Sequence, residues 1–193
     1  MMTSVEIVKM VMSNAQVSLS RDSIHALADV LVPKKYKKGE CVLNEGEVCD
    51  CLRVIEKGML RQYYFKYDKE LTEHIAYEWG TVVCLQSYIE EKPTILLIEA
   101  LEPTLLWEFP KKELERLSLE HADIGVLYRR FFEMSLIDSQ IKADIIRFEP
   151  AHERYMRLLR SHPEILKRAP LLYIASLLQM TPETLSRVRS GNQ

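Results

Sequence analysis

The spacing of apolar residues changes twice along this 193-residue chain, from helical to strand-like and back to helical. In the first 32 residues the spacing is helical, and Ser20 can cap a helix in its second half. From Pro33 to Pro110 the apolar runs are short or alternating, and turn signals such as KKGE, NEGE and EKG recur between them. This spacing is typical of an all-β sandwich or barrel.

After Pro110 the pattern is helical again. KKELERLSLEH predicts a short helix, and residues 122–148 predict a long one. Alternating steps of four and three give the long helix a coiled-coil-like seam, in which Asp138 is polar. Two interpretations of this seam are open: it packs against the β region of its own chain, or it pairs with the same helix of a second subunit. We expect the dimer, because the helix is long and joins two differently built regions. The seam residues are Leu127, Phe131, Met134, Asp138, Ile141, Ile145 and Phe148.

The stretch LLYIASLLQMTPETLSRVRS, residues 171–190, has the pattern of a helix-turn-helix. Such a unit needs apolar residues where its helices meet, a small residue where they cross, and a tight turn between them. Ala175 is the small residue, and Met180 fills the turn. A helical hairpin that closes a core would show the same pattern. The inward-facing residues are Ile174, Leu178, Leu185 and Val188.

The second helix of this unit has a strong start signal. Thr181 can cap it, and Pro182 at its first position needs no N–H partner. The outer face would present Pro182, Glu183, Thr184, Arg187 and Ser190. One turn position departs from the usual pattern, because Gln179 stands where a left-handed backbone favours glycine.

Charge and cysteine content narrow the function classes. The net charge is −2, yet residues 147–193 carry eight Lys or Arg and four Asp or Glu, which suggests a polyanionic partner. No apolar run approaches the roughly 20 residues of a membrane span, and no signal peptide is evident, so we expect a cytoplasmic protein without a membrane partner. The four cysteines are then expected to be reduced and structural, without a bound metal.

Several of these segments resemble the Crp–Fnr regulators. TPETLSRVR is similar to the recognition helix of that family; KKGE, NEGE and VIEKGMLRQYYF are similar to the opening strands of its cyclic-nucleotide-binding β-roll. The long helix is similar to its dimer helix. The resemblance implies an α+β fold with an N-terminal double-stranded β-helix, or β-roll (residues 1–120), a long dimerisation helix (residues 121–148), and a small helix-turn-helix domain (residues 149–193).

The resemblance also implies site residues and partners. Pro182, Glu183 and Arg187 would meet bases in the major groove, where Arg suits guanine and Glu can accept from cytosine. Thr181, Thr184 and Ser190 would contact phosphates. The expected partners are a palindromic double-stranded DNA operator, a second copy of the chain and RNA polymerase. The implied function is transcriptional regulation, not catalysis.

Two features depart from the family pattern. Aligned on Gly80 and Ala100, Cys84-Leu85 and Thr94-Ile95 stand where cyclic-AMP-binding members carry Gly-Glu and Arg-Ser. A pocket built from these residues and Ser87 would leave a phosphate without a cation, so we expect no cyclic AMP binding and name no cofactor or effector. SHPEILKRAP replaces the first hairpin of the usual β-wing, and no wing is expected after the recognition helix.

Two other function classes compete with the regulator. A cupin-type enzyme needs several histidines and a carboxylate around a metal, whereas His74 is the single histidine in the β region. The second rival is a ligand-binding or protein-interaction adaptor with a degenerate helix-turn-helix. A salt-dependent shift of DNA separates the adaptor from the regulator, because phosphate contacts release counterions.

Overall fold

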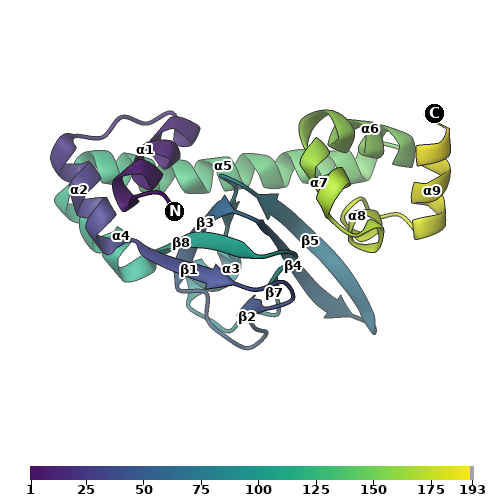
Figure 1. The fold of residues 1–193 in the computed structure, drawn as a ribbon, viewed down its shortest axis with the longest axis horizontal. Helices are drawn as coiled ribbons and strands as arrows, with labels where there is room; N and C mark the ends of the chain where they lie inside the picture. Colours follow the sequence, from purple (N-terminus) through teal and green to yellow (C-terminus); the bar gives the residue numbers. More distant parts are fainter. Residues whose placement is uncertain (192–193) are drawn as a thin grey trace.

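The computed structural model describes residues 1–191, and two short helices begin the chain. The helix α1 spans Ser4–Ala15 and α2 spans Arg21–Val30, and Ser20 caps α2 as predicted. Both lie at the end of the molecule where the long helix begins (Figure 1). Asp123 at the start of that helix accepts hydrogen bonds from Ser20 N–H and the Ser23 hydroxyl, both at 2.7 Å. The N-terminal helices therefore belong to the same body as the long helix.

The middle of the chain forms a β-roll of two four-stranded sheets, with strand orders β1-β8-β3-β6 and β2-β7-β4-β5. All the strand pairs are antiparallel. The β4–β5 hairpin turns at Tyr67-Asp68, where both residues have positive φ, as a tight hairpin turn requires. The strands are β1 (Val32–Tyr36), β2 (Cys41–Leu43), β3 (Cys51–Lys57), β4 (Met59–Lys66), β5 (Lys69–Tyr77), β6 (Thr81–Val82), β7 (Leu97–Ala100) and β8 (Thr104–Pro110).

Two helices flank the roll. The helix α3 (Leu85–Glu90) lies between β6 and β7, and α4 (Lys111–Glu120) follows β8. The sequence predicts α4 and misses α3, whose six residues are too few to show a helical period. Buried Tyr88 on α3 donates to or accepts from Tyr128 on the long helix, with 3.1 Å between their hydroxyl oxygens. This contact connects α3 to the long helix.

The long helix α5 spans Ala122–Phe148, as predicted. Its first half packs in the core of its own chain: Leu127 is 1% exposed, and Phe131 and Met134 pack partly buried beside it. The prediction that Leu127 contributes to a subunit seam is therefore wrong, because no surface of its side chain is left for a partner. Periodicity identified the apolar face correctly but could not show which neighbour covers it.

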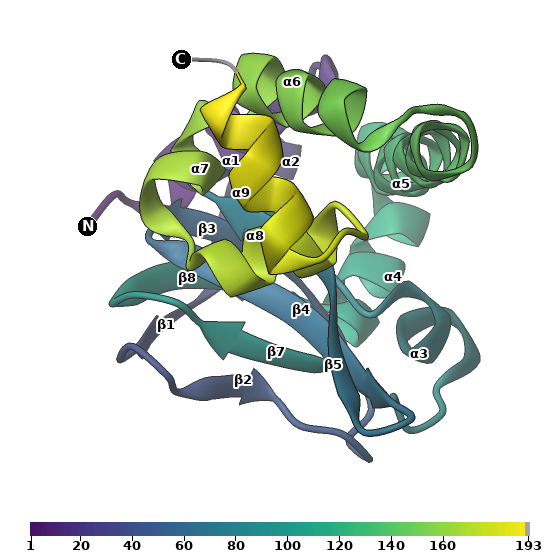
Figure 2. The same cartoon turned by 90° about the vertical axis from the view of Figure 1, so that its right-hand side faces the viewer.

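Four helices end the described chain: α6 (Ala151–Ser161), α7 (Pro163–Arg168), α8 (Leu171–Leu177) and α9 (Pro182–Ser190). They pack over the end of β4 and β5 (Figures 1 and 2). Met59 and Ile75 of these strands belong to the same buried cluster as Tyr155, Ile165 and Ile174. Residues 149–191 contain no strand, so the usual wing is absent from this part of the chain, and α7 stands in place of its first hairpin. The expected last domain also includes residues 192–193, which lie outside the described residues.

Candidate DNA-binding surface and effector pocket

The turn between α8 and α9 has the local geometry that the sequence predicts. Gln179 adopts a left-handed backbone with φ of 50°, at the position where glycine is usual. Thr181 caps α9 by accepting the Thr184 N–H at 3.2 Å, and Pro182 occupies the first turn. This cap satisfies one of the free N–H groups at the helix start and fixes where α9 begins.

A buried core holds α9 against the rest of the domain. Leu185 is 1% exposed and is in the same buried cluster as Ile174, Ala175 and Leu178, with Val188 packed at its edge. The small Ala175 is fully buried, as expected for the residue where two helices cross. The predicted inner faces of both helices are confirmed, so the opposite face of α9 is oriented by packing.

The predicted base-reading residues lie on the exposed side of α9. Pro182, Glu183 and Arg187 are all exposed. The Thr181 hydroxyl, the N–H of Glu183 itself and the charge of Arg187 lower the pKa of the Glu183 carboxyl. Glu183 and Arg187 are four residues apart and are therefore neighbours on the helix surface. They present one acceptor and one donor side by side.

The three residues predicted to contact phosphates differ in their exposure. Thr181 and Ser190 are exposed, but Thr184 is half-buried and Ser190 donates its hydroxyl to the Ser186 carbonyl at 2.9 Å. Ser186 and Arg189 are also exposed on α9, and the sequence analysis did not include them. The period of α9 could have indicated Ser186, because it lies between Glu183 and Ser190 on the outer face.

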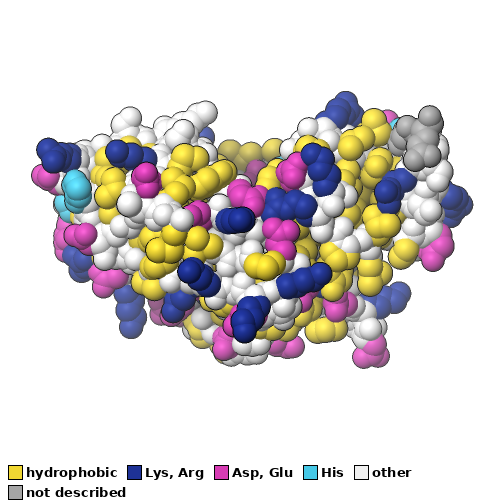
Figure 3. Space-filling view, in the orientation of Figure 1, with side chains coloured by type: hydrophobic (Ala, Val, Ile, Leu, Met, Phe, Trp, Pro, Cys, Tyr) yellow, Lys and Arg dark blue, Asp and Glu magenta, His cyan; other side chains and the backbone are white. Residues whose placement is uncertain are grey.

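Most of the basic residues near the helix-turn-helix have partners within the chain. Arg154 donates to the carbonyls of Glu149 and Gln179, and so holds the turn before α9. Arg157 pairs with Glu149, and Lys167 with Glu164. Figure 3 shows Lys and Arg side chains interspersed with Asp and Glu over one face of the molecule. The positive charge suggested by composition is thus largely offset locally, although Arg187 and Arg189 on α9 are exposed.

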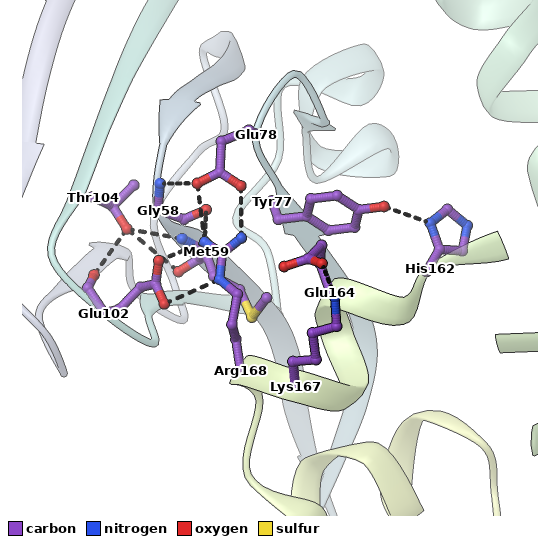
Figure 4. A network of polar contacts seen from close by, with 10 residues as sticks. All are labelled: Gly58, Met59, Tyr77, Glu78, Glu102, Thr104, His162, Glu164, Lys167 and Arg168. Atoms are coloured by element: carbon purple, nitrogen blue, oxygen red, sulfur yellow. Dashed lines mark hydrogen bonds and ion pairs between the residues drawn. The ribbon is translucent and has the colours of Figure 1, made fainter. Parts of the chain in front are cut away.

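Arg168 on α7 clamps the C-terminal helices to the β-roll (Figure 4). Its guanidinium pairs with Glu78 at 2.7 Å and Glu102 at 2.5 Å, and donates to the Gly58 carbonyl at 3.1 Å. Gly58 has φ of 111°, and a Cβ there would lie 2.4 Å from the Thr104 hydroxyl oxygen, so this strand junction requires glycine. Burial raises the pKa of Glu78, but hydrogen bonds from Arg168 and Gly58 N–H outweigh it and lower this pKa to about 2.

A second contact between the roll and the C-terminal helices lies along the β4–β5 hairpin. Buried Arg61 stacks its guanidinium 3.6 Å from the Tyr173 ring centroid, and it pairs with Glu70 and Glu99. The Ser176 hydroxyl accepts the Thr72 N–H at 2.8 Å. A groove of about 390 Å³ runs beside these contacts as far as Met180 and Pro182. The start of α9 therefore borders the β-roll.

Only some of the residues that were predicted to line an effector pocket lie close together in the structure. Cys84, Ser87 and Thr94 are buried and meet inside the roll, and Leu85 is half-buried at the start of α3. Ile95 is 64% exposed, so its assignment to the pocket is wrong. The interior is occupied by polar side chains: Gln62 Nε2 donates to Cys84 Sγ at 3.2 Å and to the Val83 carbonyl at 3.3 Å.

A sequence model of the cyclic nucleotide-binding domain family matches residues 33–121, the segment that contains the roll and α4. A comparison of the whole chain with curated proteins gives no match.

Solved structures share the fold well beyond that domain. FixK2 from Bradyrhizobium japonicum has a TM-score of 0.71 at 19% identity, with 84% of each chain covered. CLP from Xanthomonas campestris, a c-di-GMP responsive global regulator, has a TM-score of 0.67 at 19% identity, with 90% of this chain and 92% of that one covered. The catabolite activator protein of Thermus thermophilus has a TM-score of 0.58 at 17% identity, with 92% and 85% covered. The chain therefore has the fold of the Crp–Fnr regulators.

The interior of the β-roll does contain a buried cation, which the sequence did not predict. Arg53 on β3 is 3% exposed and pairs with Glu108 on β8 at 3.1 Å. The signal in the sequence was a charged residue inside the otherwise apolar run CLRVI, because a charge buried in such a run needs a partner. The guanidinium is already compensated by Glu108 and is therefore not an open phosphate site.

Neither a metal centre nor a membrane span is found in the described part of the chain. Among residues 1–191, no three His, Cys, Asp or Glu side chains lie together as metal ligands would. His74, on which a cupin-type site would depend, is exposed on β5. No helix within residues 1–191 has the length and apolar character to cross a bilayer.

Proposed function

We propose that the chain is a DNA-binding transcriptional regulator of the Crp–Fnr type, in which α9 reads base edges. The observation that carries this proposal is the exposed face of α9. Glu183 and Arg187 project from a helix that is capped by Thr181 and fixed by buried Leu185. A short capped helix with a donor and an acceptor near its start suits the major groove.

A protein-interaction adaptor is the second function that an observation favours. The charge pairs of Arg157 with Glu149 and of Lys167 with Glu164 reduce the positive field that would attract DNA. Binding to duplex DNA at several salt concentrations distinguishes the two functions. A regulator that uses Arg187, Arg189 and backbone contacts loses affinity steeply as salt rises, because each neutralised phosphate releases counterions. An adaptor gives no shift at any salt concentration.

We further propose that the second half of α5 forms a two-fold dimer. Ile137 and Ile141 are each 48% exposed and Phe148 is 72% exposed, with Met134 and Ile145 half-buried beside them. Their spacing by threes and fours is that of a helix-pairing stripe. Figure 3 shows hydrophobic side chains in the notch between the two ends of the molecule, where Figure 1 places α5.

The dimer is tested by placing charge on this stripe. The double variant Ile137→Asp/Ile141→Asp is expected to sediment as a monomer, because four carboxylates would face one another in a two-fold interface. Leu119→Asp is the matched control, because Leu119 is 90% exposed on α4, away from the stripe. Sedimentation of the double variant at the wild-type rate in analytical ultracentrifugation would exclude this stripe as the interface.

We also expect the cyclic nucleotide-binding domain to bind neither cyclic AMP nor cyclic GMP. Gln62 and Cys84 occupy the interior and hydrogen-bond to each other, and Glu108 already pairs with Arg53. A buried phosphate there would lack a free cation, which is strongly unfavourable. Titration calorimetry is expected to give no heat of binding for either nucleotide, and a micromolar Kd would contradict this expectation.

A further inference from the structure

Two buried cysteines face each other inside the roll, where family resemblance leads one to expect an effector. Cys49 precedes β3 and Cys84 stands at the N-cap position of α3 without a side-chain cap bond, and each is 1% exposed. The Cys84 N–H donates to Cys49 Sγ at 3.4 Å, so the two residues are in direct contact. The two cysteines are 35 residues apart along the chain, and this contact brings them close enough for a disulfide to form with a local movement of the start of α3.

Polar groups surround the two cysteines, although close packing of a buried cysteine needs no polar neighbour. Arg53 donates to Cys49 Sγ at 3.6 Å, and Gln62 Nε2 donates to Cys84 Sγ at 3.2 Å. Structural cysteines usually behave as small apolar residues. Cys49 Sγ lies beside one acceptor, the Cys51 carbonyl oxygen at 3.5 Å, and two donors, the Cys84 N–H and the positively charged Arg53 guanidinium. The two donors stabilise a thiolate at Cys49.

We propose that Cys49 and Cys84 form a redox-active pair, which a hydroperoxide converts into an intramolecular disulfide. Cys49 is the nucleophile. Hydrogen bonds from the Cys84 side chain and N–H, with the nearby Arg53 charge, lower the pKa of its thiol, although burial acts in the opposite sense. Burial raises the pKa of neighbouring Cys51, so Cys51 stays protonated.

The reaction has two steps. The Cys49 thiolate attacks one oxygen of the hydroperoxide, the O–O bond breaks, and the other oxygen leaves as an alcohol or as water after protonation. Cys49 is now a neutral sulfenic acid. The Cys84 sulfur then attacks the Cys49 sulfur, the S–O bond breaks, and the hydroxyl leaves as water with the Cys84 proton. The hydroperoxide is reduced by two electrons, and the two thiols are oxidised.

Formation of the sulfenic acid at Cys49 favours the attack by Cys84. The pKa of Cys84 is raised chiefly by its hydrogen bond to Cys49, and also by burial and by the Cys49 charge. Once Cys49 becomes a neutral sulfenic acid, its charge no longer opposes the ionisation of Cys84. The resolving thiol therefore becomes a better nucleophile at the moment when it is needed.

The disulfide would act on the long helix through α3. Cys84 is the N-cap residue of α3, and Tyr88 of α3 contacts Tyr128 by its hydroxyl and Phe132 by its ring. Bonded sulfur atoms lie only about 2 Å apart, closer than a hydrogen-bonded pair, so oxidation draws in the start of α3. The displacement reaches the helix that carries the proposed dimer stripe, and this consequence rests on the proposed function.

Thiol mapping tests the pair without reference to DNA. The variant Cys41→Ser removes the exposed cysteine and leaves the three buried ones. After treatment with hydrogen peroxide, denaturation and alkylation, we expect peptide mass spectrometry to show Cys49 joined to Cys84 and Cys51 alkylated. Dithiothreitol should restore two alkylated thiols. Unmodified Cys49 and Cys84, a bond to Cys51, or a sulfinic acid at Cys49 beside a free Cys84 would each overturn the proposal.

Matched variants distinguish loss of the thiol pair from a folding defect. In the Cys41→Ser background, Cys49→Ser and Cys49→Ala should each leave Cys84 alkylatable after peroxide, whereas Cys51→Ser should still form the bond. Unfolding curves verify that the variants are folded.

The expected regulatory consequence of the disulfide is a roughly 5- to 150-fold difference in DNA affinity between the reduced and oxidised forms. Equal affinities would overturn the consequence, whereas a disulfide in a protein that binds no DNA would overturn the proposed function and leave the thiol pair standing.

Discussion

Replacing Arg187 with alanine is expected to lower affinity for the cognate DNA site by about 1–3 kcal/mol and to relax the preference at one base position. Packing sets the direction of this side chain. Leu185 is buried and Val188 is half-buried, so Arg187 lies on the opposite, exposed face of α9. A guanidinium in the major groove pairs bidentately with guanine, and alanine offers no equivalent donor.

Fluorescence anisotropy with the cognate site and with single-base variants measures both effects. Arg160→Ala is the matched control, because Arg160 is exposed on α6 and its Nε donates to the Met156 carbonyl. If Arg160 contacts DNA, its loss weakens all sequences alike and reduces the salt dependence. An Arg187→Ala variant with unchanged base preferences would remove Arg187 as a reader.

Replacing Arg168 with methionine is expected to loosen the C-terminal helices from the roll and to lower the free energy of unfolding by about 2–3 kcal/mol. The substitution leaves Glu78 and Glu102 half-buried and facing each other without a cation. It also removes the donor to the Gly58 carbonyl. Lys167→Met is the control at the adjacent position, because Lys167 is exposed and pairs only with nearby Glu164 among the described contacts.

The same clamp predicts a dependence on pH. Because the folded pKa of Glu78 is about 2 and its ordinary value is 4.5, its contribution to stability is complete above pH 4.5 and is lost as the pH falls toward 2. The stability difference between wild type and Glu78→Gln should therefore shrink across this interval. Urea unfolding at pH 7, 4.5 and 3 measures it. A constant difference would contradict the assigned role of Glu78.

The features that the sequence predicted correctly depend on short-range contacts. The Thr181 cap, the left-handed Gln179 and the inner residues of α8 and α9 lie within a few residues of one another, so local rules suffice. The bounds of α5 followed from its continuous period and from Glu149-Pro150, because the residue before a proline is disfavoured in a helix.

The features that it missed depend on contacts between distant residues. Arg168 and Glu78 are 90 residues apart, so the sequence showed Arg168 only as one of the eight basic residues that suggested a polyanionic partner, whereas it joins the C-terminal helices to the roll. Cys49 and Cys84 face each other only after the roll has closed, and the pairing of Arg53 with Glu108 arises in the same way. The burial of Leu127 and the exposure of Ile95 likewise depend on which element packs over each position.

The central claim is that this chain reads DNA with α9, and a binding selection on randomised duplex DNA tests it most directly. The wild-type protein, reduced and at low salt, is expected to enrich a palindromic motif with two half-sites about one helical turn apart. Arg187→Ala, selected in parallel, should enrich the same motif with one position of each half-site relaxed. A wild-type protein that enriches no sequence would contradict the claim and favour the adaptor.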